Sequence, residues 1–588
     1  MTGFHKTCLV ALCLLVAVSV GAKTKSKSKG GPTTFREMSL RVIDTLEAID
    51  PAVATEMGSH AYDAKLADFS ATGVANAIGA LTRLQTKLNS YDTTNLNEHE
   101  RINRLLLNSN LDVALLNLKQ IQWYKRSPYL YVDQAIDGLY FLMLSRHATL
   151  GAKMASILGR AGEVPKLFAV AQRNLKTPPK VWIESAVEGL KSGRDFYLAV
   201  QKQLTDSFPA RTGEISSTFG KAVAAIDGYS AFLVKLPPGP DNSFAIGKAN
   251  YDYLLAHQYF MPYNSETLLK IGDSLLKSAQ AEYAEYTDFV DLNKQTGLDS
   301  VYIPRNFTRA DLLDYYNWEV NQVRIFLTAN DIVTIPDDIA PCNVIETPTF
   351  LRPMIGGIAY QPAGPFDDNQ VGMFYVRPVP DSLSRTELEA RYRYVHRRGF
   401  KGSVVHEAYP GHHLQMQLAG RNVDPVRKWQ MNNQIIEGWA LYSEDMMYQA
   451  GLYGDEDPAQ WLGVLGGIRF RAARIIADVK LHTGQFTYDQ CVAWMQKTLE
   501  SKSVADSNYI RTEVRRYTHE PTQPMCYLTG KREIQRLYDA YAEREGAGFS
   551  EKDFHDALLS EGSIPLSLFW RIWKLQPVST VLGGDRQK

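Results

Sequence analysis

The chain has 588 residues, of which 45% are hydrophobic, 22% are charged and 11% are aromatic. This is the composition of a globular protein, and the length allows several ordinary domains or one large body of two lobes. The 64 basic and 64 acidic residues cancel, which argues against nucleic acid as a partner but leaves peptides and small molecules open.

The first 22 residues have the organisation of a signal peptide. Lys6 precedes an apolar run over residues 8–20, and the small pair Gly21-Ala22 follows. We expect cleavage after Ala22 and a secreted or lumenal protein. The run is shorter than the roughly 20 residues that span a bilayer, so we expect no membrane span after the signal peptide is removed.

Three further segments follow along the chain. Residues 23–35 are basic and poor in apolar side chains, which predicts a disordered leader. Residues 36–330 show apolar side chains at helical spacing and are predicted to form an N-terminal helical lobe, with Ser265 as the N-cap of one helix. Residues 331–588 are predicted to form a second lobe, which carries the residues with chemical potential.

Short β-prone stretches at 358–361 and 372–377 flank a turn-like segment at 365–369, which predicts a small antiparallel sheet. The fold class is therefore mainly α: a large two-lobed body of many helices with one small sheet beside its most polar helices.

Helices resume after the sheet. Asp424-Pro425 is typical of a helix start, and we expect that helix to continue through residue 437. Thr487 and Gln490 form a predicted capping box. The mature chain retains three cysteines, which allow at most one disulfide, and Asn306 begins its N-x-S/T sequon.

The residues that indicate a chemistry lie in two short runs. His406 and Glu407 precede His412 on one predicted helix, and Glu437 lies on the next. Two histidines from one helix and a glutamate from another commonly hold catalytic zinc, with one position left for water. A glutamate directly after the first histidine then serves as the general base.

The spacing of the histidines needs an irregular helix. Six residues correspond to about 9 Å of rise and about 240° of rotation in a straight helix, too far apart to share an ion. Pro410 interrupts the helix, and Gly411 tolerates unusual dihedral angles, so a two-residue bulge would return His412 to the side of His406. His413 would need a larger correction and is the less favoured ligand.

Several residues are candidates for supporting roles. Glu444 lies two turns from Glu437, so it either orients a histidine N–H or forms a surface salt bridge. Asp478 and His482 can meet on one helix face; they form a buried ion network, or Asp478 supports a metal ligand and His482 contacts substrate.

Other side chains are candidates for contacts with substrate. Tyr527 is the preferred donor to a developing oxyanion, and Arg516 is a candidate anchor for a substrate carboxylate. An edge strand near the metal would bind an extended peptide, with Tyr360 and Tyr375 along that cleft. His413 is a further candidate for substrate binding.

The runs His-Glu-x-x-Pro-Gly-His-His-x-Gln and Glu-Gly-Trp-Ala-x-Tyr-x-Glu, which begin at His406 and Glu437, resemble the family called domain of unknown function 885. That family is similar to zinc metallopeptidases of the gluzincin type. The resemblance implies that His412 is the second histidine ligand and that Glu437 binds zinc. The two additional residues between the histidines depart from the usual gluzincin pattern.

The favoured hypothesis is a metallopeptidase with one zinc ion that acts on peptides or small polypeptides; manganese and cobalt suit the same ligands. Two alternatives stay open: a metal-dependent hydrolase of another amide or ester, and a secreted metal-binding protein without catalytic activity. The sequence carries no signal for an oligomeric state.

Overall fold

The computed structural model describes residues 34–289, 308–348, 351–352, 355, 357–380, 382–395, 400–454, 458–501 and 503–576. The predicted signal peptide, leader residues 23–33 and Asn306 lie outside the described residues. The first helix begins at Phe35 with Thr34 as its N-cap. The helix therefore includes residue 35, which was predicted to be the last residue of the leader. The mainly α fold class is confirmed.

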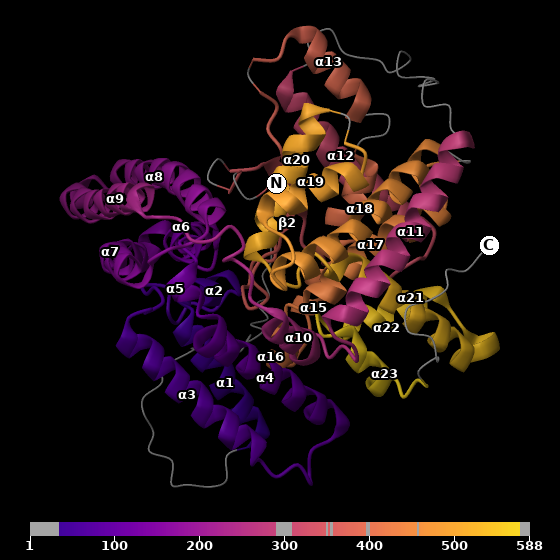
Figure 1. Cartoon of the computed structure of the whole chain (residues 1–588), viewed down its shortest axis with the longest axis horizontal. Coiled ribbons are helices and arrows are strands. Elements are labelled where there is room, and N and C mark those ends of the chain that lie inside the picture. The colour runs from indigo at the N-terminus through magenta and orange to yellow at the C-terminus, as the bar shows by residue number, and fades with distance from the viewer. Residues whose placement is uncertain are drawn as a thin grey trace, which may run out of the picture.

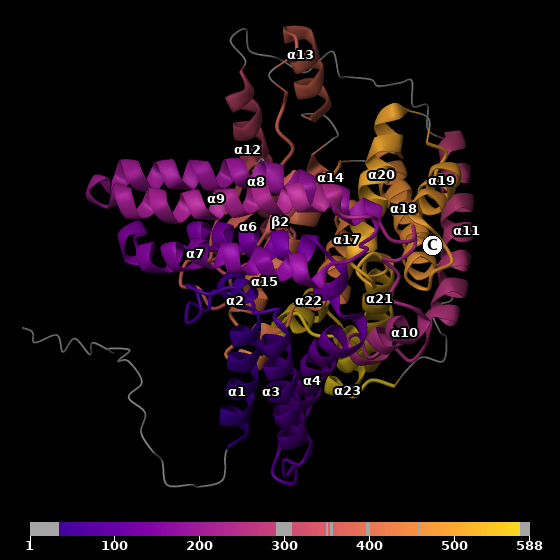
Figure 2. The same cartoon turned by 60° about the vertical axis from the view of Figure 1, so that its left-hand side comes forward.

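Helices make up most of the chain before the sheet (Figures 1 and 2). They are α1 (Phe35–Ile49), α2 (Pro51–Glu56), α3 (Ala71–Asn89), α4 (Glu98–Leu116), α5 (Trp123–Arg126), α6 (Tyr129–Leu144), α7 (Leu150–Asn174), α8 (Lys180–Ser207), α9 (Thr212–Lys235), α10 (Lys248–His257), α11 (Ser265–Phe289) and α12 (Arg309–Ala329). The side chain of Asn264, rather than the predicted Ser265, accepts from a backbone N–H in the first turn of α11.

The sheet is mixed and has the strand order β1-β3-β2. β2 (Ala359–Gln361) pairs with β3 (Gly372–Val376) in the predicted antiparallel sense. β1 (Cys342–Glu346), which was not predicted, adds a parallel neighbour to β3. The sheet is therefore not purely antiparallel as expected, because a third strand reaches β3 from before the hairpin.

Helices continue after the sheet: α13 (Arg385–Tyr394), α14 (Lys401–Glu407), α15 (His412–Gly420), α16 (Pro425–Trp429), α17 (Asn433–Gln449), α18 (Pro458–His482), α19 (Tyr488–Thr498), α20 (Val504–His519), α21 (Cys526–Glu545), α22 (Glu551–Ser560) and α23 (Phe569–Ile572). The capping box of Thr487 and Gln490 opens α19. Asp424-Pro425 begins α16, but this helix ends at Trp429, and Asn432 caps a new helix that carries Glu437. The expectation of one continuous helix is wrong.

Strand β3 lies between two hydrophobic cores. Phe374 and Val376 pack with α1, α4, α12 and α17, whereas Met373 and Tyr375 pack with α6–α9. A third core joins α10 and α11 to α18–α21, and α11 runs along α18 (Figure 1). Helices from both predicted lobes therefore share cores, and the boundary at residue 330 stays a prediction.

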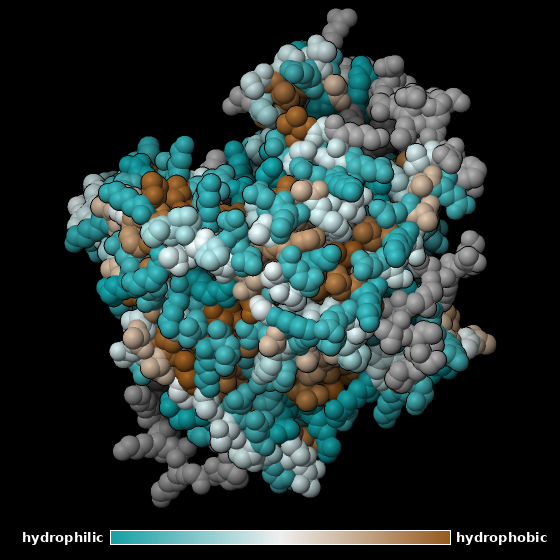
Figure 3. Space-filling view, in the orientation of Figure 1, coloured by the Kyte–Doolittle hydropathy of each residue, from teal (hydrophilic) through white to brown (hydrophobic). Residues whose placement is uncertain are grey.

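Hydrophilic side chains predominate on the face in Figure 3, and hydrophobic ones gather in smaller groups between them. Among the described residues, no helix has the length and apolarity needed to cross a membrane. The cysteines Cys342, Cys491 and Cys526 are all buried and free, so the fold depends on its cores.

Candidate metal centre

The predicted two-residue bulge lies between α14 and α15. The N–H of Gly411 donates to the carbonyl of Val405 at 3.0 Å, and that of Leu414 donates to Ala408 at 3.2 Å. Each bond reaches back six residues, two more than in an α-helix. The two additional residues are thus looped out, and the helical path continues on the far side.

Two contacts hold the bulge in this shape. A Cβ on Gly411 would lie 1.9 Å from the carbonyl oxygen of His406, so any larger residue would push the turn open. The indole of Trp439 on α17 donates to the carbonyl of Pro410 at 2.8 Å. The helix that carries Glu437 therefore also fixes the turn that carries the histidines.

The bulge brings three side chains around one point. The Oε2 atom of Glu437 lies 3.6 Å from Nε2 of His406 and 3.4 Å from Nε2 of His412, and the three donor atoms lie within 4.8 Å of one another. Donor atoms around a tetrahedral zinc with bonds of 2.0–2.1 Å are about 3.4 Å apart. Glu437 Oε2 is buried without a hydrogen-bond partner among the described residues, as a ligand atom would be, and this donor set fits a divalent cation.

Electrostatics favour a charged Glu437. Burial alone would raise the pKa of this carboxyl, but its interactions with His406 and His412 hold the pKa well below its usual range. A carboxylate that stays ionised in a buried setting is a suitable ligand for a cation.

Glu444 orients the first histidine, one of its two predicted roles. Its Oε1 lies 2.8 Å from Nδ1 of His406 and accepts from Arg471 at 3.2 Å. A carboxylate on Nδ1 leaves Nε2 as the nitrogen directed at Glu437. Burial would raise the pKa of Glu444, but Arg471 and His406 lower it.

His413 faces away from this cluster. It is fully buried; its Nε2 donates to the carbonyl of Ala340 at 2.9 Å, so its Nδ1 accepts from the Tyr360 hydroxyl, also at 2.9 Å. Burial lowers the pKa of His413 to about 4. Both nitrogens are engaged behind Tyr360, so this position lends no support to a contact between His413 and substrate, which stays a prediction.

A cavity of about 1130 Å³ opens onto the cluster. His406, His412 and Glu437 line it together with Glu407, and so do Tyr360, Arg516 and Tyr527. Within the described part of the chain no side chain hydrogen-bonds to the Glu407 carboxylate. Glu407 is thus exposed to the same space as the three donor atoms.

Gln523, whose role the sequence did not suggest, connects Glu437 to Tyr527. Its Nε2 donates to Glu437 Oε1 at 3.1 Å and to the Tyr527 hydroxyl at 3.2 Å. The ring of Tyr527 is nearly parallel to that of His406, with 6.4 Å between centroids. Because the Tyr527 oxygen accepts from Gln523, its own hydrogen remains available to the cavity.

The close approach of α17 and α21 makes these contacts possible. The helices cross at Gly438 and Gly530, where a Cβ on Gly530 would lie 2.0 Å from the carbonyl oxygen of Gln434. Glycine at both positions therefore lets the neighbouring Glu437 and Tyr527 reach the same cavity.

Arg516 lines the cavity but is held by acidic partners. It donates to Glu513 at 3.1 Å, to Glu520 at 2.8 Å and to Gln523 Oε1 at 3.0 Å. A substrate carboxylate would have to share this guanidinium with two carboxylates.

Asp478 and His482 lie outside the cavity and are fully buried. Asp478 accepts from Tyr251 at 2.8 Å and from the N–H of Thr522 at 3.1 Å, and His482 donates to the carbonyl of Tyr517 at 2.8 Å. These hydrogen bonds tie α18 to α20 and to the turn before α21. Neither residue lines the cavity, so the suggested contacts with a metal ligand and with substrate gain no support here and stay predictions.

Tyr375 is likewise absent from the cleft. Its side chain is buried among α6–α9, and its hydroxyl bonds that of Tyr140. Successive residues of a strand point to opposite faces, so Tyr360, paired opposite Phe374, faces the other way.

Known proteins resemble the chain over nearly its full length. A structure of a protein of unknown function from Shewanella oneidensis, described as a lipoprotein, has a TM-score of 0.73 and 23% identity, and the match covers 92% of this chain and 100% of that one. A protein from Colwellia psychrerythraea, also described as a lipoprotein, has a TM-score of 0.72 and 18% identity over 92% and 98%. These likenesses show the fold.

No curated protein matches the chain. The family described as bacterial protein of unknown function (DUF885) matches residues 51–571, which include every residue of the candidate metal centre. The chain therefore belongs to the DUF885 family.

Proposed function

We propose that the chain is an exported, zinc-dependent metallopeptidase. The observation that carries the proposal is the convergence of His406 Nε2, His412 Nε2 and Glu437 Oε2, with separations of 3.4 and 3.6 Å to the carboxylate oxygen. This convergence depends on the bulge between α14 and α15, which aligns the two imidazoles. A divalent ion held there supplies a Lewis acid and lowers the pKa of water.

The other cavity residues supply the acid–base chemistry. Glu407 takes the proton of the attacking water and returns it to the leaving amine. Tyr527 donates its hydroxyl hydrogen to the carbonyl oxygen as negative charge develops there. Gln523 keeps that hydroxyl oriented because it donates to the phenol oxygen.

A peptide is the substrate that the cavity wall suits best. Residues Ala359 and Tyr360 of β2 line the cavity, and among the described residues β2 pairs with β3 alone. Its free edge offers backbone N–H and C=O groups to an extended peptide. The Tyr360 hydroxyl has donated its hydrogen to His413, so it has no hydrogen to offer to a substrate carbonyl.

The motif resemblance to gluzincins supports the same conclusion, because the residues aligned as zinc ligands are those that converge. Export is supported by the predicted signal peptide and by the description of the two similar structures as lipoproteins.

The test is the variant Glu407→Gln, which removes the base but no ligand. We expect zinc content equal to that of the unchanged protein and loss of peptide cleavage. Cleavage is measured by mass spectrometry of a peptide-library digest with and without chelator. Glu214→Gln on α9, whose carboxylate pairs with Arg211 at the surface, is the matched control and should cleave normally.

Undiminished cleavage by Glu407→Gln would refute the general-base assignment. Chelator-sensitive turnover of amide or ester substrates without defined peptide products would mean that the protein is another metal-dependent hydrolase and not a peptidase. A protein that binds zinc but turns over none of these substrates would be a binding protein.

A further inference from the structure

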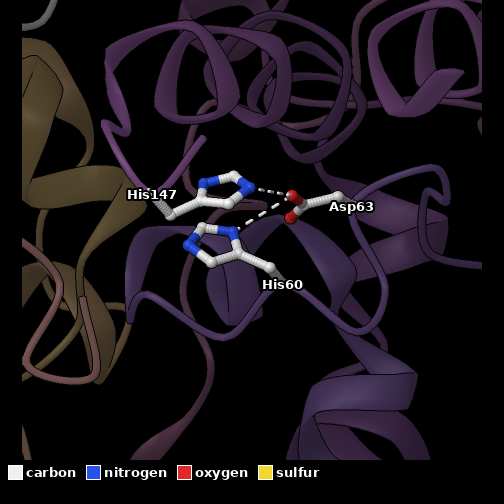
Figure 4. Close-up of side chains that lie close together, drawn as sticks. All are labelled: His60, Asp63 and His147. Atoms are coloured by element: carbon white, nitrogen blue, oxygen red, sulfur yellow. Dashed lines mark hydrogen bonds and ion pairs between the residues drawn. The ribbon is translucent and has the colours of Figure 1, made fainter. Parts of the chain in front are cut away.

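A second group of metal-ligating side chains lies far from the first in the sequence. His60 and Asp63 follow α2, and His147 follows α6 (Figure 4). Asp63 is almost fully buried, whereas the two histidines retain exposed fractions of 20% and 24%. The group is thus packed into the protein yet reachable from solvent.

The donor atoms are spaced for one cation. Asp63 Oδ2 lies 3.0 Å from Nδ1 of His60 and 3.9 Å from Nε2 of His147, and one donor atom from each residue lies within 4.8 Å of the others. The separation around a tetrahedral zinc is about 3.4 Å, between these two values. The rings are stacked with 3.4 Å between centroids and 18° between planes, so both nitrogens face the carboxylate from one side (Figure 4).

Each of the three side chains is also held from behind. Asp367 Oδ1 lies 2.9 Å from Nε2 of His60, and Ser145 Oγ lies 2.8 Å from Nδ1 of His147. The Thr55 hydroxyl donates to the second oxygen of Asp63 at 2.7 Å. Hydrogen bonds to the outer nitrogen are what orient histidine ligands in metal sites.

We propose that His60, Asp63 and His147 bind a second divalent metal ion, independent of the one at Glu437. Its role follows from the segments it would join. Asp367 belongs to the loop between β2 and β3, and the next residue back, Phe366, donates its N–H to the carbonyl of Met57 at 3.0 Å. An ion there would fasten the loop after α2 to the segment after α6, beside the hairpin that His60 contacts through Asp367.

Without an ion, the cluster would be an ion triad in which His60 is protonated between two carboxylates. Burial lowers the pKa of His60, but Asp367 and Asp63 together raise it to about 9. That triad explains the position of His60. It leaves unexplained why His147 also turns Nε2 toward the same Asp63 oxygen, and a shared cation accounts for this approach of both histidines.

Two basic side chains lie nearby and are held by other groups. Lys153 donates to the carbonyls of Leu142 at 2.7 Å and Ser145 at 2.6 Å. Arg160 donates to the Thr55 hydroxyl at 2.8 Å. Neither bonds Asp63 directly, so neither basic side chain competes with a cation for the Oδ2 atom that the two histidines approach.

The test counts bound zinc per chain after chelator treatment, zinc addition and dialysis, by elemental mass spectrometry on the full chain. We expect two ions in the unchanged protein, one in His147→Gln, one in His412→Gln and none in the double variant. The two proposals fail differently. If His147→Gln loses an ion and His412→Gln does not, the site at His147 stands and the site at Glu437 is refuted.

Equal zinc content in His147→Gln and the unchanged protein, with matching circular dichroism spectra, would overturn the second site. His257→Gln is the control, because His257 pairs with Asp112 at 3.0 Å without a second histidine; loss of an ion there as well would mean adventitious binding. Ser145→Ala keeps all three donors but removes the hydroxyl that orients His147. It should weaken the affinity of this site for zinc by about tenfold or more, and an unchanged affinity would also count against the site.

Discussion

Three consecutive residues of α17 each contribute a separate part of the candidate metal centre. Glu437 points its carboxylate at the two histidines, Gly438 admits the backbone of α21, and Trp439 bonds the carbonyl of Pro410. A short motif of this kind therefore encodes a ligand, a helix crossing and the shape of a distant turn.

Sequence spacing predicted some of these residues and missed others. The distance of seven residues between Glu437 and Glu444 excluded a shared ion and suggested the histidine contact. Gln523 lies 86 residues from Glu437, and no periodic pattern connects side chains across such a separation. The orientation of His413 was not predictable, because it depends on Tyr360 and Ala340, which come from another segment.

The two tyrosines of the cavity should differ in their effect on catalysis. Tyr527 has a free hydroxyl hydrogen, so Tyr527→Phe should lower kcat by about 100-fold with unchanged zinc content. Tyr360 has already donated its hydrogen, so Tyr360→Phe should cost less in kcat and act mainly on KM. Steady-state kinetics on one peptide measures both, and equal losses of kcat would contradict the assignment of Tyr527 as donor.

At the scale of elements, the bulge between α14 and α15 was predictable because helix geometry excludes a six-residue spacing and Pro-Gly marks the break. The end of α16 was not, since Trp429–Asn432 contains neither proline nor glycine. Strand β1 was missed because its partner β3 begins 30 residues further along the chain, and parallel pairing leaves no local turn signal.

The crossing of α17 and α21 should be sensitive to a single methyl group. Gly530→Ala places a Cβ 2.0 Å from the carbonyl oxygen of Gln434, so we expect a loss of about 1–3 kcal/mol in the free energy of unfolding. Gly228→Ala on α9 is the matched control, because nothing lies within 4 Å of its added Cβ. It should stabilise the helix by up to about 1 kcal/mol, and urea denaturation compares the two; equal effects would contradict the tight crossing.

The attachment of α18 to the turn before α21 should depend on pH. Burial raises the pKa of Asp478 to about 7 from an ordinary value of 3.8. The folded state therefore binds the proton more tightly than the unfolded state, and this contribution to stability is lost as pH rises from about 4 to about 7.

Asp478→Asn cannot ionise, so its free energy of unfolding should fall less steeply over that range, by at most about 1.4 kcal/mol per pH unit. Urea denaturation at several pH values gives the slopes. Asp489→Asn, whose carboxylate is 84% exposed, should keep the slope of the unchanged protein, and identical slopes in all three proteins would exclude Asp478 as the titrating group.

At the scale of the whole molecule, residues from distant parts of the chain line the cavity. Glu56 ends α2, Tyr259 follows α10, and Arg474 lies on α18, yet all line the same space. Composition and periodicity predicted a mainly α body, but not that helices before and after residue 330 would share cores, because periodicity identifies a buried face and not its partner.

The dimensions of the cavity should limit the size of substrates. A volume of about 1130 Å³ accommodates a short extended segment and excludes a folded domain. We expect kcat/KM to be highest for short peptides and cleavage of a folded protein to be absent, with the proteolytic fragments of the same protein as the control. Mass spectrometry of the products measures both, and efficient internal cleavage of a folded protein would contradict this size limit.

The position of β3 between two cores connects the wall of the cavity to two groups of helices. One face of the strand is packed on the helices α6–α9, and its backbone bonds β2, which carries Tyr360. The three donor atoms lie instead on α14, α15 and α17, which pack with the other face of the strand. A substitution among α6–α9 would therefore reach the cavity wall through β3, whereas one on α14, α15 or α17 would act on the donor atoms directly.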